Sequence, residues 1–448
     1  MMENINLLPL LTILIALSTV NFCIFFYFDL LQPTVSFFSV MTISLFLGVL
    51  NIKRWNLFVS SETSLIVIFG MLAFAGGAVF AHYCSCKKKA ADINTLNRIK
   101  LGAYDIPWQF IFLCTIVVLI LAYFSFREMY DLSVQLGNHE GVRNMIKTLR
   151  FPLEQGKIHF SRMNSYRNMI SMVIATSFLY FFINNLVAEK KIVLKHFLLV
   201  LPIIAVFPFF VMSTGRRSIV HFIICGIVLA SIILQQKNGA THKTRMKIVK
   251  LLAIAGVIAV GIYFAMGFLT GKVSVGGRDP LTIISHYGGL SVPALEQYIT
   301  SVHSENQYIM QNTMMGVYGN LNSLGFHLES GKDFLPFVSF QGTDSITTNV
   351  YTVFYRLLAD YSIPGLLLIM FLFGAILTYS YDYLKYTDAP GMLAVYAYFG
   401  YIPFFLFIDD QFMGLFRTRT IYFVIILVAF IYVLRKRYFH LDLKNDAS

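Results

Sequence analysis

Long runs of apolar residues dominate the chain and alternate with short polar segments. As α-helices, most of these runs would cross the ~30 Å hydrocarbon core of a bilayer, which takes about 20 residues. The pattern therefore predicts an all-α fold, a single polytopic membrane domain over residues 1–448 with about 11 transmembrane helices. We expect them near residues 5–28, 35–52, 63–84, 108–126, 168–187, 197–212, 218–234, 248–269, 362–384, 392–408 and 420–434.

A different pattern precedes the run that starts at residue 362. Thr347, Thr348 and Asn349 can each accept a hydrogen bond from the free N–H groups of a starting helix. Residues 350–361 then have helical spacing, with a polar stripe along one side at Asn349, Thr352, Arg356 and Asp360. Arg356 and Asp360 lie four residues apart and are expected to pair. The pattern predicts an amphipathic helix at the membrane surface, and a plain interfacial anchor is the alternative.

Composition excludes a soluble domain and disfavours a nucleic-acid partner. The 448 residues are 57% hydrophobic, 16% aromatic and only 13% charged. The formal net charge is +12, but the basic residues lie between apolar runs, where they orient spans and contact anionic lipid headgroups. Five cysteines, an odd number, argue against a disulfide framework. Since no carboxylates or histidines have metal-ligand spacing, we expect neither metal nor other cofactor.

Basic residues also predict the orientation of the chain. With Arg435-Lys436-Arg437 in the cytoplasm and the spans alternating, most Lys and Arg residues fall on the cytoplasmic side. Two long segments then lie outside, a basic loop over 127–167 and a large loop over 270–361. The basic loop departs from the positive-inside rule, so either the predicted topology is wrong there or its charges have a function outside. The first apolar run lacks a cleavage site and is expected to remain as a span.

The predicted spans argue against transport. Many transporters are built from duplicated halves, and no internal repeat is evident here. The spans also lack Asp, Glu, Lys and Arg near their midpoints, where coupled transporters usually carry them. A channel or an ion-coupled pump is therefore disfavoured.

Candidate chemistry gathers in the predicted outer segments. Ser213 to Arg217 form a tight turn before a span, and the guanidiniums of Arg216 and Arg217 at a helix N-terminus suit an anion. A basic turn that only contacts headgroups is the alternative. In the large loop, Arg278 and His286 accompany aromatic and amide residues of the kind that line sugar sites. His286 is a candidate general base, and an ordinary hydrogen-bonded loop histidine is the alternative.

Several short motifs make the chain resemble the Wzy-type oligosaccharide repeat-unit polymerases, also called the O-antigen polymerase family. They are Leu31-Gln32-Pro33, Ser61-Glu62-Thr63, Thr214-Gly215-Arg216-Arg217, Tyr287-Gly288-Gly289 and Thr348-Asn349-Val350-Tyr351-Thr352 with Asp360 and Gly365. Arg278 followed by Gly289 also fits the Arg-x10-Gly pattern of that family. The chain has Asp360-Tyr361-Ser362 where the family usually has Asp-Phe-Gly.

The resemblance implies a membrane glycosyltransferase of the bacterial inner membrane with its active site on the periplasmic side. Such enzymes join undecaprenyl-diphosphate-linked oligosaccharide units, and a flippase and a chain-length regulator of the same pathway are the expected partners. The diphosphate would be bound by Arg216, Arg217, Arg278 and Arg356. The sugars would be bound by Tyr287, Asn349, Tyr351 and Thr352. Catalysis is assigned to His286, Asp360 and Arg356, with Asp344 as a further candidate base.

The sequence leaves two other functions open. O-antigen ligases share the architecture and the lipid-diphosphate donor, and only the Thr348–Thr352 motif favours a polymerase. A lipid-linked oligosaccharide flippase is disfavoured, because such proteins have duplicated halves and lack an outer loop of this length. If the chain is a polymerase, the basic loop over 127–167 would attract anionic lipid-linked substrate.

Overall fold

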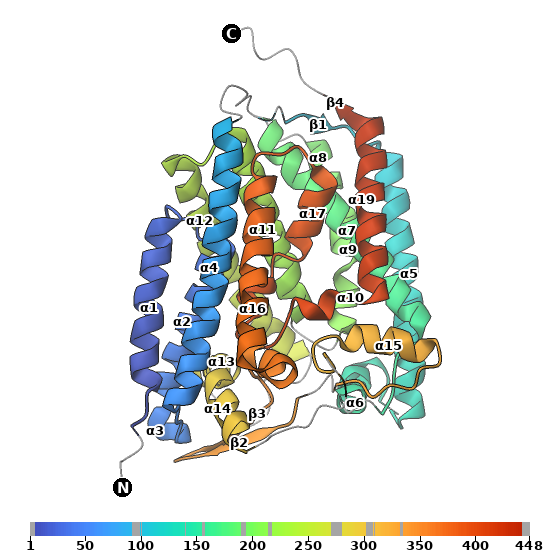
Figure 1. Cartoon of the computed structure of the whole chain (residues 1–448). Coiled ribbons are helices and arrows are strands. Elements are labelled where there is room, and N and C mark those ends of the chain that lie inside the picture. The colour runs from blue at the N-terminus through green and yellow to red at the C-terminus, as the bar shows by residue number, and fades with distance from the viewer. Residues whose placement is uncertain are drawn as a thin grey trace. The chain divides into compact units, whose positions relative to one another are not determined.

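The computed structural model describes residues 5–91, 99, 101–138, 140–154, 157–189, 194–213, 217–269, 280–301, 308, 310–331 and 335–440. The chain divides into two compact units, each built from segments that alternate along the sequence. Figure 1 labels the helices and strands from which they are built. Unit 1 comprises Met1–Thr95, Arg278–Tyr383 and Ile402–Thr418, and unit 2 comprises Leu96–Gly277, Leu384–Tyr401 and Arg419–Ser448. The sequence predicts one membrane domain, within which the structure distinguishes these two units.

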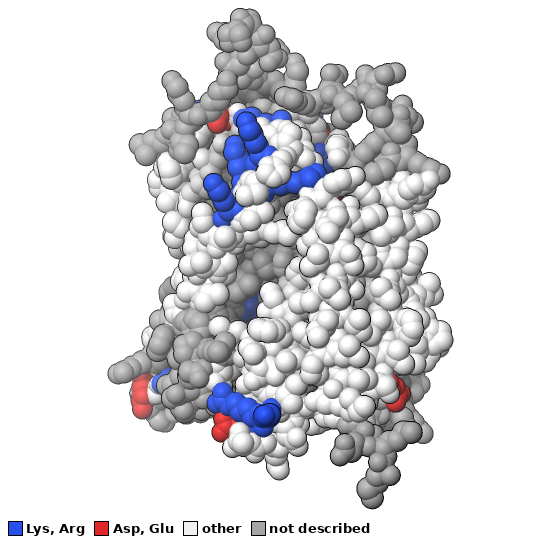
Figure 2. Space-filling model, turned by 90° about the vertical axis from the view of Figure 1, so that its left-hand side faces the viewer, with Lys and Arg blue, Asp and Glu red and all other residues white. Residues whose placement is uncertain are grey.

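Within the described residues, nine helices are long and apolar enough to cross a membrane. They are Leu8–Phe25, Pro33–Leu50, Ser61–Ser85, Trp108–Gln135, Arg162–Ala188, Lys195–Met212, Arg217–Asn238, Val353–Leu384 and Thr418–Tyr438. Large apolar side chains remain exposed on them, such as Ile13 at 57% and Ile425 at 58%. One face is white across most of its middle, with Lys and Arg gathered toward its ends (Figure 2). The chain is a mainly helical, multi-pass membrane protein, as the sequence predicts.

Unit 1 holds the N-terminal helices and most of the segment after residue 278. Its elements are α1 (Leu8–Phe25), α2 (Pro33–Leu50), α3 (Ile52–Trp55), α4 (Ser61–Ala91), α13 (Pro280–Gly288), α14 (Ser291–Ser301), α15 (Met315–Ser323), β2 (Val338–Gln341), β3 (Ser345–Thr348), nearly all of α16 (Val353–Leu384), α18 (Ile402–Phe405) and the 3-10 helix η2 (Met413–Leu415). Strands β2 and β3 form an antiparallel hairpin in which Val338 lies opposite Thr348. Its tip contacts α3, where Arg54 Nε and Asp344 Oδ2 are 2.8 Å apart. This hairpin is an exception to the predicted all-α fold.

Unit 2 holds the middle and the end of the chain. Its elements are β1 (Ala103–Tyr104), α5 (Trp108–Gln135), α6 (Val142–Glu154), α7 (Arg162–Ala188), α8 (Leu194–Leu198), α9 (Leu201–Ala205), α10 (Phe207–Met212), α11 (Arg217–Asn238), α12 (His242–Leu269), α17 (Pro390–Tyr398), α19 (Thr418–Tyr438) and β4 (Phe439–His440). Asn185 exchanges hydrogen bonds of 2.8 Å with both backbone groups of Tyr104. Arg435 and Asp388 form a bidentate ion pair with distances of 3.0 and 2.6 Å.

Two predicted spans are broken helices. The segment 197–212 consists of α8, α9 and α10, and prolines stand in the first turns of α9 and α10. Proline lacks the N–H that would continue the preceding helix, so each one starts a new short helix. The segment 392–408 consists of α17 and α18, separated by turn residues 399–401. The helix expected at 248–269 lies within α12. The total of 11 spans stays a prediction.

The two predicted loops contain more regular structure than the sequence suggests. Helix α5 continues to Gln135 and α7 begins at Arg162, so much of 127–167 extends the flanking helices, and α6 lies between them. The helix expected over 350–361 begins at Val353, because Thr347 and Thr348 belong to β3 and do not cap it. It is broken at Ser362, whose φ is 56°, just before Pro364.

Two glycines allow α4 and α16 to approach each other backbone to backbone. A Cβ added to Gly77 would lie 1.9 Å from the carbonyl oxygen of Phe371. A Cβ added to Gly374 would lie 1.9 Å from that of Phe74. Any side chain would force the helices apart, and small residues serve this purpose at helix crossings in membranes. The crossing fixes the spanning part of α16 against α4.

We expect Gly374→Ala to destabilise the protein by about 1–3 kcal/mol, because the new methyl group would overlap a backbone carbonyl that cannot move alone. The matched control is Gly256→Ala on α12, where an added Cβ meets nothing within 4 Å. The control should be neutral or stabilising, by at most about 1 kcal/mol. Thermal unfolding in detergent measures both variants. Equal melting temperatures for the two would contradict the close crossing.

Candidate functional site

Helix α16 begins inside unit 1. The N–H of Val353 donates to the carbonyl of Leu406 at 2.8 Å, which ties its first turn to the segment after α18. Phe354 is fully buried, and a Cβ added to Gly70 of α4 would lie 2.4 Å from its ring. Arg356 is thereby carried into the interior and is only 2% exposed. Residues 351–357 are buried, so this helix does not lie on a surface as the sequence predicts, because polar groups of other segments cover its polar side.

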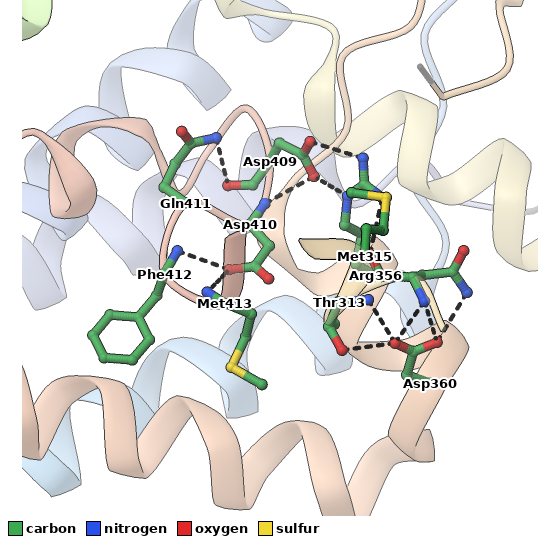
Figure 3. Close-up of polar contacts among 10 residues, drawn as sticks. Thr313, Met315, Arg356, Asp360, Asp409, Asp410, Gln411, Phe412 and Met413 are labelled. Carbon is green, nitrogen blue, oxygen red and sulfur yellow. Dashed lines mark hydrogen bonds and ion pairs between the residues drawn. The ribbon is translucent and has the colours of Figure 1, made fainter. Parts of the chain in front are cut away.

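Arg356 forms a bidentate ion pair with Asp409 (Figure 3). Nε lies 2.8 Å from Oδ1 and Nη2 lies 3.2 Å from Oδ2. Nη1 donates to the carbonyl of Asn312 at 3.1 Å and approaches the sulfur of Met315 at 3.5 Å. The guanidinium side chain is 3% exposed and the carboxylate side chain 23%. The sequence pairs Arg356 with Asp360, but the bidentate partner comes from another segment of the chain.

The next residue, Asp410, is also a buried carboxylate. Its N–H donates to Oδ1 of Asp409 at 2.8 Å. Its own Oδ1 accepts from the N–H groups of Phe412 at 2.9 Å and Met413 at 3.0 Å, which caps the short helix η2. Burial raises the pKa of Asp410 to about 7, and the charge of Asp409 adds to the rise. Two consecutive carboxylates thus share one guanidinium.

Asp360 is held separately by the segment before α15. Its carboxylate accepts from the N–H and the side-chain amide of Asn312 at 2.9–3.1 Å. It also accepts from the N–H and the hydroxyl of Thr313, both at 2.8 Å. The hydroxyl of Tyr361 lies 3.0 Å from that of Thr313. These hydrogen bonds hold the segment before α15 against Asp360 of α16. The carbonyl of Asn312 in the same segment accepts a hydrogen bond from Arg356.

Aromatic rings pack beside Arg356. The ring of Tyr355 lies 4.3 Å from that of Tyr298 and 4.6 Å from that of Tyr351, measured between centroids. Tyr351 is 1% exposed, and its hydroxyl donates to the carbonyl of Pro336 at 3.1 Å. The assignment of Tyr351 to sugar binding therefore needs correction, because neither ring face is accessible to a pyranose.

The other predicted sugar and base residues have different surroundings. Thr352 is fully buried, and its hydroxyl has no hydrogen-bond partner within the described part of the chain. Asn349 is half-buried between β3 and α16, and Tyr287 is 40% exposed. His286 Nε2 donates to the carbonyl of Thr347 in β3 at 2.8 Å. His286 thus makes an ordinary structural hydrogen bond, which the sequence analysis gives as the alternative to a general base.

The predicted diphosphate-binding arginines are only partly described. Arg216 and Arg278 lie outside the described residues. Arg217 opens α11 in unit 2 with an exposed side chain. His221, one turn further, stacks on Tyr401 with ring centroids 3.6 Å apart. Arg356, the predicted cation that the structure describes in unit 1, contacts Asp409.

Some motifs of the resemblance have local structural roles. The side chain of Gln32 accepts from the N–H groups of Thr34 and Val35 and so caps α2. A Cβ added to Gly48 would lie 2.9 Å from the carbonyl oxygen of Gly289, so α2 and the turn after α13 meet at glycines. Capping and close packing explain these residues without a substrate.

Sequence reasoning missed Asp409, Asp410, Asn312 and Thr313. One signal was present: Asp409 and Asp410 follow the apolar run over 402–408 directly and have no basic neighbour before Arg417. Two carboxylates at the end of such a run require a cation from elsewhere in the chain. The roles of Asn312 and Thr313 had no comparable signal, because their contacts are largely made through backbone groups.

The cluster of Arg356, Asp409 and Asp410 can hold a proton, since one guanidinium balances only one of the two carboxylates. Within the described residues, no three His, Cys, Asp or Glu side chains are grouped as a metal site requires. No family model, curated protein or solved structure matches the chain. The geometry of the cluster is therefore the basis for assigning a function.

We expect Arg356→Gln to destabilise the protein by about 3–5 kcal/mol, because it leaves the carboxylate of Asp409 without its cation. Arg435→Gln is the matched control, since Arg435 forms a bidentate pair with Asp388, which is 49% exposed. Removing such an exposed pair costs at most about 1 kcal/mol. Chemical denaturation in detergent measures both. Similar losses for the two variants would show that Arg356 is not a structural ion-pair partner.

Proposed function

We propose that the chain is a polysaccharide polymerase of the bacterial inner membrane. In this proposal it transfers an oligosaccharide from an undecaprenyl-diphosphate carrier to the non-reducing end of a new lipid-linked unit, on the periplasmic side. The observation that carries the proposal is the buried Arg356–Asp409 pair in a helical membrane unit. Arg356 lies four residues after the Thr348–Thr352 motif of the polymerase resemblance.

Two considerations support glycosyl transfer at this cluster. A lipid-linked donor carries its own leaving group, so the reaction needs no nucleotide or ATP outside the cell. The acceptor hydroxyl needs a proton acceptor, and carboxylates commonly serve as one. Asp409 provides a carboxylate that is partly exposed and fixed in orientation.

The ion pair changes the role proposed for Arg356. A diphosphate would use the Nε–Nη2 edge of the guanidinium, which Asp409 occupies. We therefore assign Arg356 to orienting Asp409 and leave the diphosphate to exposed arginines. Arg417 in unit 1 has an exposed side chain, and Arg217 stays a candidate from the sequence. Arg216 and Arg278 remain candidates from the sequence.

Deletion of the gene, followed by gel analysis of surface polysaccharide, tests the function. If the protein is a polymerase, the deletion strain should carry single repeat units in place of the ladder of longer polysaccharide chains. Loss of all attached polymer would indicate a ligase instead, and lipid-linked units trapped on the cytoplasmic side would indicate a flippase. Complementation with Arg356→Lys should leave the ladder about 100-fold weaker or absent, because an ammonium cannot replace the bidentate fork.

The matched complementation uses Arg435→Lys, which changes an exposed pair in unit 2 in the same way. It should restore the ladder fully, with both proteins present in the membrane at equal levels by immunoblot. A normal ladder from Arg356→Lys would remove the cluster from the proposed mechanism.

The proposed orientation predicts the accessibility of two exposed positions. In a cysteine-free background, a cysteine at Ser345 in β3 should react with a membrane-impermeant maleimide in intact spheroplasts. A cysteine at Lys243, in the first turn of α12, should react only after the membrane is opened. The reverse labelling pattern would place the site cluster on the cytoplasmic side.

A further inference from the structure

The charges around Arg356 do not cancel. Asp360 is stabilised by four donor groups of Asn312 and Thr313. Asp409 and Asp410 are adjacent in the chain and have Arg356 as their cation. Two neighbouring carboxylates cannot both ionise easily in a buried site, so such a pair retains one proton to unusually high pH. The pair is therefore suited to gaining or losing a proton near neutral pH.

The two carboxylates differ in access. The side chain of Asp409 is 23% exposed, whereas Asp410 is 8% exposed as a whole residue. Oδ1 of Asp409 accepts from Arg356 Nε and from the Asp410 N–H, while Oδ2 accepts only from Arg356 Nη2 within the described contacts. A carboxylate oxygen can accept about two hydrogen bonds, so Oδ2 retains acceptor capacity. Asp409 is the member of the pair that a substrate hydroxyl can reach.

The other titratable groups around the pair are tyrosines and Arg356. Tyr355 interacts electrostatically with Asp409, and Tyr361 with Asp410, both from α16. Tyr318 of α15 interacts with Asp360. Tyrosines ionise near pH 10 in water, so they stay neutral at physiological pH. Of these groups in the described part of the chain, Asp410 is the one with a pKa near neutral pH.

We propose that Asp409 accepts the proton of the attacking sugar hydroxyl and that the adjacent carboxylate of Asp410, whose N–H donates to Oδ1 of Asp409, supports this transfer by its negative charge. This assignment rests on the proposed glycosyl transfer. The hydroxyl oxygen forms the new bond to C1 of the donor sugar, and the C1–O bond to the diphosphate breaks. The electron pair of that bond leaves on the diphosphate, and the hydroxyl proton goes to Oδ2 of Asp409. Asp410 is a positioning residue, because it is too deeply buried to contact the sugar.

The rate should rise with pH through about 7, because the pair accepts a proton from substrate only when both carboxylates are ionised. Asp410→Asn keeps an oxygen that can accept from the Phe412 and Met413 N–H groups, so it should fold. It removes the carboxyl group whose pKa lies near 7, and with it the negative charge beside Asp409. We expect its kcat to fall about 10-fold with little change in KM, and its pH-dependent rise to disappear between about pH 6 and 8.

The experiment measures single-unit transfer by purified protein in liposomes, with a lipid-linked repeat unit as substrate. Asp409→Asn should lose about 100-fold or more in kcat at every pH. Since that variant also loses the ion pair, Asp409→Glu keeps the base and should retain measurable transfer with the wild-type pH profile. Asp388→Asn is the control and should match wild type, since Asp388 pairs with Arg435 in unit 2.

If the wild type is active, either of two results would overturn the roles assigned to Asp409 and Asp410 but not the proposed function. One is an unchanged pH profile in Asp410→Asn, and the other is near-normal transfer by Asp409→Asn. Inactive wild type would instead overturn the proposed function and this assignment with it. Infrared difference spectroscopy tests the proton itself without substrate. A carboxylic acid carbonyl band should vanish as pH rises through about 7 and be absent in Asp410→Asn. No such band in wild type would show that the pair does not hold the proton.

Discussion

A guanidinium buried among apolar helices cannot remain without a counter-charge, and this constraint organises unit 1. Arg356 is 2% exposed, so its charge has to be balanced by Asp409 from a distant part of the chain. The pair fixes the segment after α18 against the first turns of α16. Through the Asn312 carbonyl and Asp360, it also fixes the segment before α15. Three stretches of sequence thus meet at one cation.

The cost of burying these charges is also the argument for function. A buried ion pair adds little to stability compared with an apolar replacement, so its presence calls for another explanation. The second carboxylate, Asp410, strengthens this argument, because within the described residues it is buried without a second cation beside it. Asp409, partly exposed and held by Arg356, would act on substrate, while the adjacent charge of Asp410 would support that step.

The sequence predicted the apolar helices well, because a run of about 20 apolar residues has few alternatives to a spanning helix. Local patterns were less reliable. Thr347 and Thr348 resemble helix caps, yet they pair with β2, a partner distant in sequence. Arg356 and Asp360 have the spacing of an ion pair, but Asp409, Asn312 and Thr313 compete for them through tertiary contacts. Helical periodicity identifies residues on one face and does not reveal what packs against that face.

A double-mutant cycle on Arg356 and Asp409 tests the central claim most directly. Arg356→Met, Asp409→Leu and the double variant would be compared with wild type by chemical denaturation in detergent. We predict that each single change costs about 3–5 kcal/mol, while the double change costs far less than their sum because no charge remains unpaired. Losses that simply add would show that the two residues do not depend on each other and would contradict this account.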